Sequence, residues 1–209
     1  GGVRGYPRGL IREVRWHGDA MKRAQDILLA GIGLLLSSPV WVLISLAIKL
    51  EDRGPVFYRQ DRVGKRGKVF QVVKFRSMIS DAEGTVGPIQ ATNRDPRVTR
   101  VGRVLRATAL DELPQLWNII KGDMSLVGPR PERPEFVGPL STIIPYYEER
   151  HLIKPGLTGW AQINYPYGST IADARRKLQL DLYYMKHTTL ELDLIVMLRT
   201  FGTFFLGSR

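Results

Sequence analysis

The sequence predicts an α+β fold that is mostly helical. Three observations carry this prediction: an uncharged apolar run of helical length at 27–48, two strand-like runs around the turn "GKRG", and helix-like segments in the C-terminal half. The chain of 209 residues has the size of one domain and can bury a core without disulfides or metals.

The composition excludes several classes of site. The chain has no cysteine, so a disulfide framework, a thiolate zinc site and a cysteine nucleophile are all ruled out. The three histidines, His17, His151 and His187, lie far apart and lack metal-ligand spacing. The net charge of +11 favours an anionic partner, which can be nucleic acid, an anionic membrane surface or a phosphorylated small molecule.

The apolar run "ILLAGIGLLLSSPVWVLISLAI" at 27–48 predicts a membrane segment or a very apolar core helix. Pro39, preceded by Ser37 and Ser38, removes a backbone hydrogen bond and predicts a sharp bend. Both flanks of the run are basic, which draws both ends toward the cytoplasm. A segment that enters and leaves on one face fits these features, and so does a kinked transmembrane helix.

The next segment, "PVFYRQDRVGKRGKVFQVVKFRSM", predicts a basic β-hairpin that turns at "GKRG". Residues 84–95 predict a loop, and arginines at steps of three from Arg94 to Arg106 predict a basic helix face.

Thr108 and Asp111 resemble a capping box, and Pro114 suits a first helical turn, so Asp111 and Glu112 are expected near a helix N-terminus. Gly122 is the predicted end of this helix.

Loops and helices alternate in the rest of the chain. Three prolines between 129 and 134 predict a rigid loop that holds Arg130, and 154–170 reads as a second loop. Residues 171–186 predict a helix, and Thr189 is expected to cap an apolar helix at 190–206, which suits either the core or a membrane surface.

Asp111 and Glu112 taken alone fit ordinary first-turn charges, because carboxylates complement the helix dipole. Their cationic surroundings suggest more. Arg106, Arg130 and the hairpin cations Lys74 and Arg76 are expected around them, which suggests a divalent cation and a phosphorylated substrate. Attack by a carboxylate on a pyrophosphate needs Mg2+ and arginines to neutralise the phosphate oxygens, and two adjacent acids can divide nucleophilic attack and metal binding.

Several long motifs now occur in one order: the apolar run with Ser38-Pro39, then "GPVFYRQDRVGKRGKVFQVVKFRSM", "DPRVTRVGRVLRATALDELPQLWNIIKGDMSLVGPRPE" and "KPGLTGWAQI". Over roughly 22–205 they resemble the bacterial sugar transferases known as monotopic phosphoglycosyl transferases.

The resemblance implies transfer of a sugar-1-phosphate from a UDP-sugar to polyprenyl (undecaprenyl) phosphate with release of UMP, which starts assembly of a membrane glycoconjugate or exopolysaccharide. It implies that Asp111 is the covalent nucleophile and that Glu112 assists with Mg2+, both on the catalytic helix. It also implies a re-entrant helix broken at Ser38-Pro39, and C-terminal amphipathic helices on the cytoplasmic face of the bacterial inner membrane.

The same resemblance implies that Arg106 and Arg130 contact phosphate or nucleotide. Lys74 and Arg76 are expected near the site, although hairpin cations could equally meet anionic lipid head groups. Residues 22–209 are expected to form a membrane-associated catalytic domain. Residues 1–21 are then a native tail or the edge of a larger chain.

Two other functions fit some of these features. A membrane-bound glycosyl transferase would move the sugar alone and release UDP, and a non-catalytic basic protein would bind the membrane surface without needing Asp111. The long apolar run and the lack of aromatics among the arginines argue against a nucleic-acid partner. The expected partners are the UDP-sugar, polyprenyl phosphate and membrane lipids; a homodimer is left open, and no motif identifies the sugar.

Overall fold

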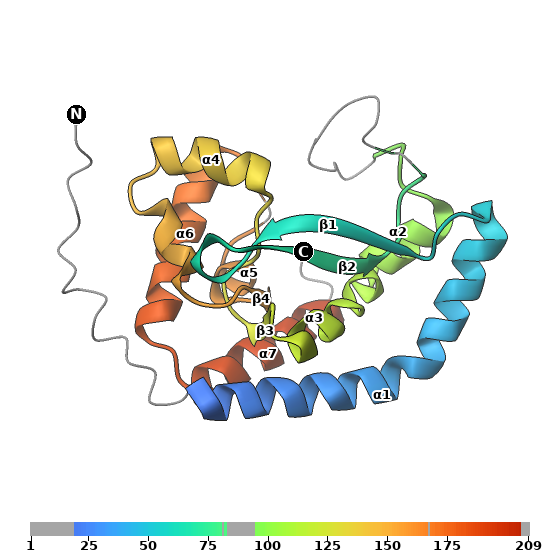
Figure 1. Ribbon diagram of the computed structural model, residues 1–209, viewed down its shortest axis with the longest axis horizontal. Coiled ribbons are helices and arrows are strands. Elements are labelled where there is room, and N and C mark those ends of the chain that lie inside the picture. Colours follow the sequence, from blue (N-terminus) through green and yellow to red (C-terminus); the bar gives the residue numbers. More distant parts are fainter. Residues whose placement is uncertain (1–18, 81, 83–94, 167, 206–209) are drawn as a thin grey trace.

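The structure is a computed structural model that describes residues 19–80, 82, 95–166 and 168–205. It confirms a mostly helical α+β fold with small sheets and one long apolar helix near the N-terminus (Figure 1). The elements are α1 Asp19–Asp52, β1 Phe57–Val63, η1 Lys65–Gly67, β2 Val69–Phe75, α2 Arg100–Ala107, η2 Leu110–Glu112, α3 Gln115–Lys121, β3 Ser125–Val127, α4 Pro134–Ile143, η3 Tyr147–Leu152, β4 Gly156–Thr158, α5 Trp160–Asn164, α6 Ile171–Lys186 and α7 Leu190–Phe205.

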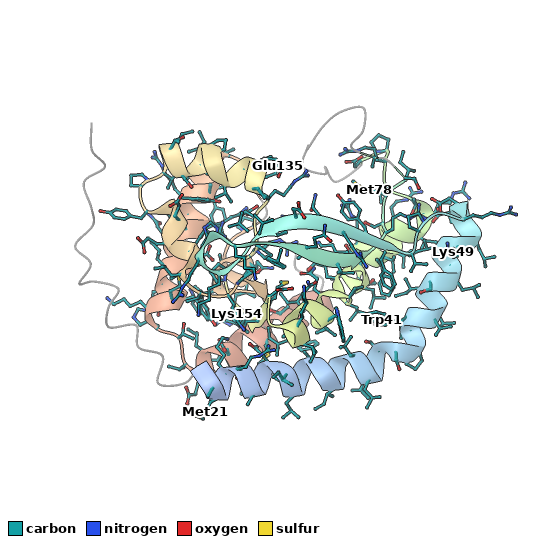
Figure 2. The ribbon with its side chains drawn as sticks, viewed as in Figure 1. Met21, Trp41, Lys49, Met78, Glu135 and Lys154 are labelled. Carbon is teal, nitrogen blue, oxygen red and sulfur yellow. The ribbon has the colours of Figure 1, made fainter. Side chains whose placement is uncertain are left out.

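Helix α1 is bent, as Pro39 predicts. Figure 1 shows one arm running along the molecule and a second arm turning up toward the hairpin. Trp41 lies at the bend, and Lys49 lies on the second arm (Figure 2). Pro39 has no N–H to offer the carbonyl of Leu35, and the Ser38 hydroxyl donates to that oxygen instead, at 2.8 Å.

The apolar surface of α1 is largely exposed, which excludes a buried core helix. Only 11% of its most apolar window is buried, and its exposed side chains are mainly leucine and isoleucine. Polar contacts nevertheless tie its first arm to the rest of the fold. Arg23 donates to the carbonyls of Ile119 and Ile120, both at 2.6 Å, and Asp26 accepts from the Leu126 N–H at 2.9 Å. This helix is therefore part of the domain's packing.

The predicted hairpin is confirmed. Strands β1 and β2 pair antiparallel from Phe57↔Phe75 to Val63↔Val69, and η1 makes the turn with Gly67 at φ +76°. Phe57 and Phe75 stack with centroids 5.4 Å apart, and Trp41 meets Phe75 edge-on at 5.1 Å. These rings fasten the open end of the hairpin to the second arm of α1.

A second, parallel sheet forms where the sequence predicted only loops. Strand β3 pairs with β4 in the register Ser125↔Gly156 and Val127↔Thr158. Gly156 allows this approach, because a Cβ there would lie 2.6 Å from the carbonyl oxygen of Gly128. Pairing of such short strands depends on long-range packing, which local sequence periodicity does not reveal.

Helix α6 begins and ends at the predicted residues, and Thr189 caps α7 by accepting from the Leu192 N–H at 3.1 Å. One face of α7 packs inward through Asp193 and Val196, and Asp193 pairs with Lys22 of α1. The opposite face leaves apolar side chains exposed, namely Leu194, Ile195, Leu198 and Phe201. Helix α7 therefore exposes an apolar surface to its surroundings. The expected tail at 1–21 and the expected loop at 84–95 lie mostly outside the described residues.

Candidate active site

Asp111 and Glu112 lie on η2, a single 3-10 turn between α2 and α3. The expected cap by Thr108 is wrong, because its hydroxyl donates to the Val104 carbonyl at 2.8 Å and so belongs to the end of α2. Ala109, at φ +51°, then reverses the chain into η2. Pro114 does stand at the start of α3, and Gly122 ends that helix at φ +97°. The two carboxylates therefore precede α3 on a separate turn.

Glu112 is held by two cations that come from different elements. Its Oε1 lies 2.7 Å from Nζ of Lys74 on β2 and 2.9 Å from Nη2 of Arg130 in the proline-rich loop. Burial opposes ionisation, but these two charges and their hydrogen bonds outweigh it and keep the pKa of Glu112 well below its ordinary value. Glu112 is therefore ionised at neutral pH.

Asp111 meets a different environment. Its side chain is buried, and burial raises its pKa above the ordinary aspartate value, with the Glu112 charge acting in the same direction. Lys74, Arg106 and Arg130 lower it but do not cancel the effect of burial. Within the described residues, no hydrogen bond or ion pair engages the Asp111 carboxylate. A substrate or cation that reached its oxygens would meet no competing partner among these residues.

The structure brings three of the four predicted cations to the carboxylates. Lys74 and Arg130 contact Glu112 directly, and Arg106 acts on Asp111 through its charge. Arg76 makes its ion pair elsewhere, with Asp52 at the end of α1.

The loop that carries Arg130 is fixed by two residues that the sequence analysis did not single out. Arg150 donates from Nη2 to the backbone carbonyl of Arg130 at 3.1 Å, and Arg62 donates to the carbonyl of Pro131 at 3.0 Å. Arg150 is fully enclosed by Asp181, 2.8 Å away, and by the Tyr147 hydroxyl, 2.9 Å away. The lone acid Asp181 in the apolar run "LQLDLYY" was the one signal in the sequence for this arrangement.

The carboxylates are suited to Mg2+ only when a substrate supplies further oxygens. The described residues contain no cluster of three metal-ligating side chains. Mg2+ is commonly held by one or two carboxylates together with substrate phosphates. Asp111, which is buried and makes no ion pair with any residue that the structure describes, meets this requirement, with Glu112 beside it.

Comparison with known proteins identifies the family of the chain. The family described as "Bacterial sugar transferase" matches residues 17–207, and the chain belongs to this family. It is 45% identical over 90% of its length to the UDP-N-acetylgalactosamine-undecaprenyl-phosphate N-acetylgalactosaminephosphotransferase of Aeromonas hydrophila. It is 46% identical over 88% of its length to the UDP-glucose:undecaprenyl-phosphate glucose-1-phosphate transferase of Escherichia coli (strain K12).

The chain spans only 44% and 40% of the lengths of these two relatives. A third relative, the exopolysaccharide production protein PSS of Rhizobium leguminosarum bv. phaseoli, is 41% identical, and the match covers 92% of it. The shared region therefore corresponds to nearly all of a short family member and to less than half of the longer ones.

Proposed function

We propose that this protein is a phosphoglycosyl transferase. It transfers a sugar-1-phosphate from a UDP-sugar to polyprenyl phosphate and releases UMP, at the start of membrane glycoconjugate or exopolysaccharide assembly. The names of the relatives from Aeromonas hydrophila and Escherichia coli support the substrate classes. The observation that carries the proposal is a buried carboxylate, Asp111, that no described residue engages, beside one that two cations hold ionised.

In the first step, an oxygen of Asp111 attacks the phosphorus that bears the sugar. A bond forms between this oxygen and the phosphorus, and the bond from the phosphorus to the bridging oxygen breaks. UMP leaves with that oxygen, and the sugar phosphate stays on Asp111 as an acyl phosphate. Arg130 and Arg106 neutralise phosphate oxygens during the attack.

In the second step, a phosphate oxygen of the polyprenyl phosphate attacks the same phosphorus. The bond between phosphorus and the Asp111 oxygen breaks, which regenerates the carboxylate and leaves a polyprenyl diphosphosugar. Lys74 and Arg130 keep Glu112 ionised and in place throughout both steps. Bound at Asp111 and Glu112, Mg2+ would supply positive charge to the diphosphate oxygens.

We propose a re-entrant topology for α1, with the domain on the cytoplasmic face of the inner membrane. Both ends of α1 bond to the same body: Arg23 to the end of α3, and Glu51 to the backbone N–H groups of Arg100 and Val101. A straight spanning helix would carry its ends to opposite sides of the bilayer. The exposed apolar face of α7 supports a membrane surface beside α1.

The test is to identify the nucleotide product. Purified protein in nanodiscs is incubated with Mg2+, undecaprenyl phosphate and each of several UDP-sugars, with Asp111→Asn as the matched variant. UMP from one sugar with the wild-type protein, and none with the variant, is the expected result, and it also identifies the donor. UDP as the product would instead establish an ordinary glycosyl transferase. Anionic vesicle binding with neither nucleotide released from any donor would favour the non-catalytic membrane protein.

A further inference from the structure

The end of α1 meets two other elements in one junction. Figure 1 shows the second arm of α1 reaching the open end of the hairpin and the start of α2. We call this the α1 junction; its members are Glu51, Asp52, Gly54, Arg76 and the residues 99–102. The dyad is defined here as Asp111 and Glu112.

Asp52 binds the end of the hairpin through an ion pair with Arg76. The guanidinium of Arg76 donates to both oxygens of Asp52, in one case at 2.7 Å, and also donates to the Ser80 hydroxyl at 3.0 Å. Arg76 is only 6% exposed. Gly54 closes the guanidinium in, because a Cβ at this position would lie 2.8 Å from Cζ of Arg76. Arg76 is therefore held in one orientation, two positions beyond Lys74.

Glu51 holds the start of α2. Its two oxygens accept from the backbone N–H groups of Arg100, at 2.7 Å, and Val101, at 3.1 Å. The Thr99 hydroxyl accepts from the next N–H, that of Gly102, at 2.9 Å. These are the groups that a helix cannot satisfy internally, so α1 supplies most of the N-terminal cap of α2.

The packing at the junction leaves little room for α2 to move. A Cβ at Gly102 would lie 2.6 Å from the carbonyl carbon of Ser77, so α2 lies directly on the backbone that follows β2. Ile44 and Ile48 of α1 share a buried cluster with Phe75 and Leu105. Leu110 and Leu113, which flank the dyad in sequence, pack against that same cluster.

We propose that Glu51 and Asp52 are positioning residues that fix the dyad to the second arm of α1. Glu51 acts through α2, which leads directly into η2 and Asp111. Asp52 acts through Arg76 and the strand that carries Lys74, the partner of Glu112. The catalytic part of this inference rests on the proposed function, whereas the structural part does not.

The test compares Glu51→Ala and Glu51→Gln with Glu148→Gln, a matched change at an exposed glutamate on η3. Hydrogen exchange is measured for residues 100–113, and kcat and KM for the UDP-sugar are measured in nanodiscs. For Glu51→Ala, we expect exchange in α2 to be about tenfold faster, because a helix cap is lost. We expect kcat to fall about tenfold or more through misplacement of the nucleophile, with KM within about twofold of wild type.

The Glu51→Gln variant keeps one acceptor oxygen, so its hydrogen exchange rate and its kcat should lie between those of wild type and Glu51→Ala. If Glu51→Ala fails to fold, Glu51→Gln alone provides the comparison with wild type. Glu148→Gln should match wild type in both measurements. Unchanged exchange in Glu51→Ala would overturn the proposal, and so would faster exchange with an unchanged kcat, which would show a purely structural role. If wild type releases no UMP, the proposed function fails, and the exchange measurement alone then decides whether Glu51 fixes the segment.

Discussion

Asp111 and Glu112 are adjacent in the chain but have opposite electrostatic environments. Two cations hold Glu112 as an anion, whereas burial disfavours the charge on Asp111. A desolvated carboxylate with no partner is a stronger nucleophile than a solvated one, and it is also a source of instability in the folded chain. Neutral substitutions at the two positions should therefore change the stability of the fold in opposite directions.

Asp111→Asn should abolish turnover, by at least about a thousandfold, because the amide cannot form the acyl phosphate. It should also raise the unfolding temperature. The folded pKa of Asp111 is above its unfolded value, so wild type loses stability as the pH rises through this pKa, and the variant does not. Thermal unfolding across a pH series checks this. A stability gain that shrinks with rising pH would contradict it.

Glu112→Gln should destabilise the fold, by about 1–3 kcal/mol, because Lys74 and Arg130 lose their shared counter-charge in a partly buried site. The folded pKa of Glu112 is below its unfolded value, so the loss should be complete at neutral pH and should fade in acid, where wild type also becomes protonated. Denaturant unfolding of both proteins measures the difference. A variant as stable as wild type at pH 7 would show that the two ion pairs contribute little.

At the scale of elements, local signals were sufficient for the hairpin, the bend at Pro39, the end of α3 at Gly122 and the bounds of α6. Thr170 and Asp173 form a complete capping box at the start of α6, which explains why a purely local signal placed that helix correctly.

The elements that were missed depend on distant partners. Thr108 carried a capping pattern, but the reversal at Ala109 assigned it to the preceding helix. The pair β3 and β4 exists only because two short segments meet across the core. The sequence predicted that Lys74 and Arg130 lie near the two carboxylates, and both contact Glu112. The role of Arg150 was not predicted, because its partners Asp181 and the Arg130 carbonyl lie far from it in sequence.

Asp181→Asn should cost about 3 kcal/mol in stability, because it leaves the guanidinium of Arg150 buried without its closest counter-charge. The double variant Arg150→Met with Asp181→Leu should recover much of this stability, since it removes both charges. Its kcat should stay about tenfold low, because the Arg130 carbonyl has lost its donor and the loop is no longer fixed. Recovery of both stability and kcat would show that the pair does not position Arg130.

At the scale of the whole molecule, α1 runs along one side of the domain (Figure 1). Hydrogen bonds join one end of α1 to α3 and the other end to α2. This arrangement makes the topology measurable. The chain has no cysteine, so single cysteines can be introduced without removing any native ones.

Cysteines at the exposed positions Met21 and Lys68 should both react with a membrane-impermeant maleimide from the cytoplasmic side only, because the proposed re-entrant topology keeps both ends of the apolar run 27–48 on that side. A cysteine at Leu36, in the exposed apolar part of α1, should stay unlabelled from either side. Labelling of inverted vesicles and of intact spheroplasts provides the comparison. Labelling of Met21→Cys and Lys68→Cys from opposite sides would establish a spanning helix.

The bend in α1 has a mechanical consequence for the bilayer. In the proposed re-entrant topology, α1 enters and leaves through one leaflet and α7 lies at the surface of that leaflet, so the protein adds cross-sectional area to that leaflet and none to the other. This added area relieves packing stress in a leaflet that is on the convex side of a curved membrane. At equal lipid area, the protein should therefore bind more strongly to small vesicles than to large ones of the same composition. Equal binding to both vesicle sizes in a sedimentation assay would mean that the protein adds its cross-sectional area to both leaflets.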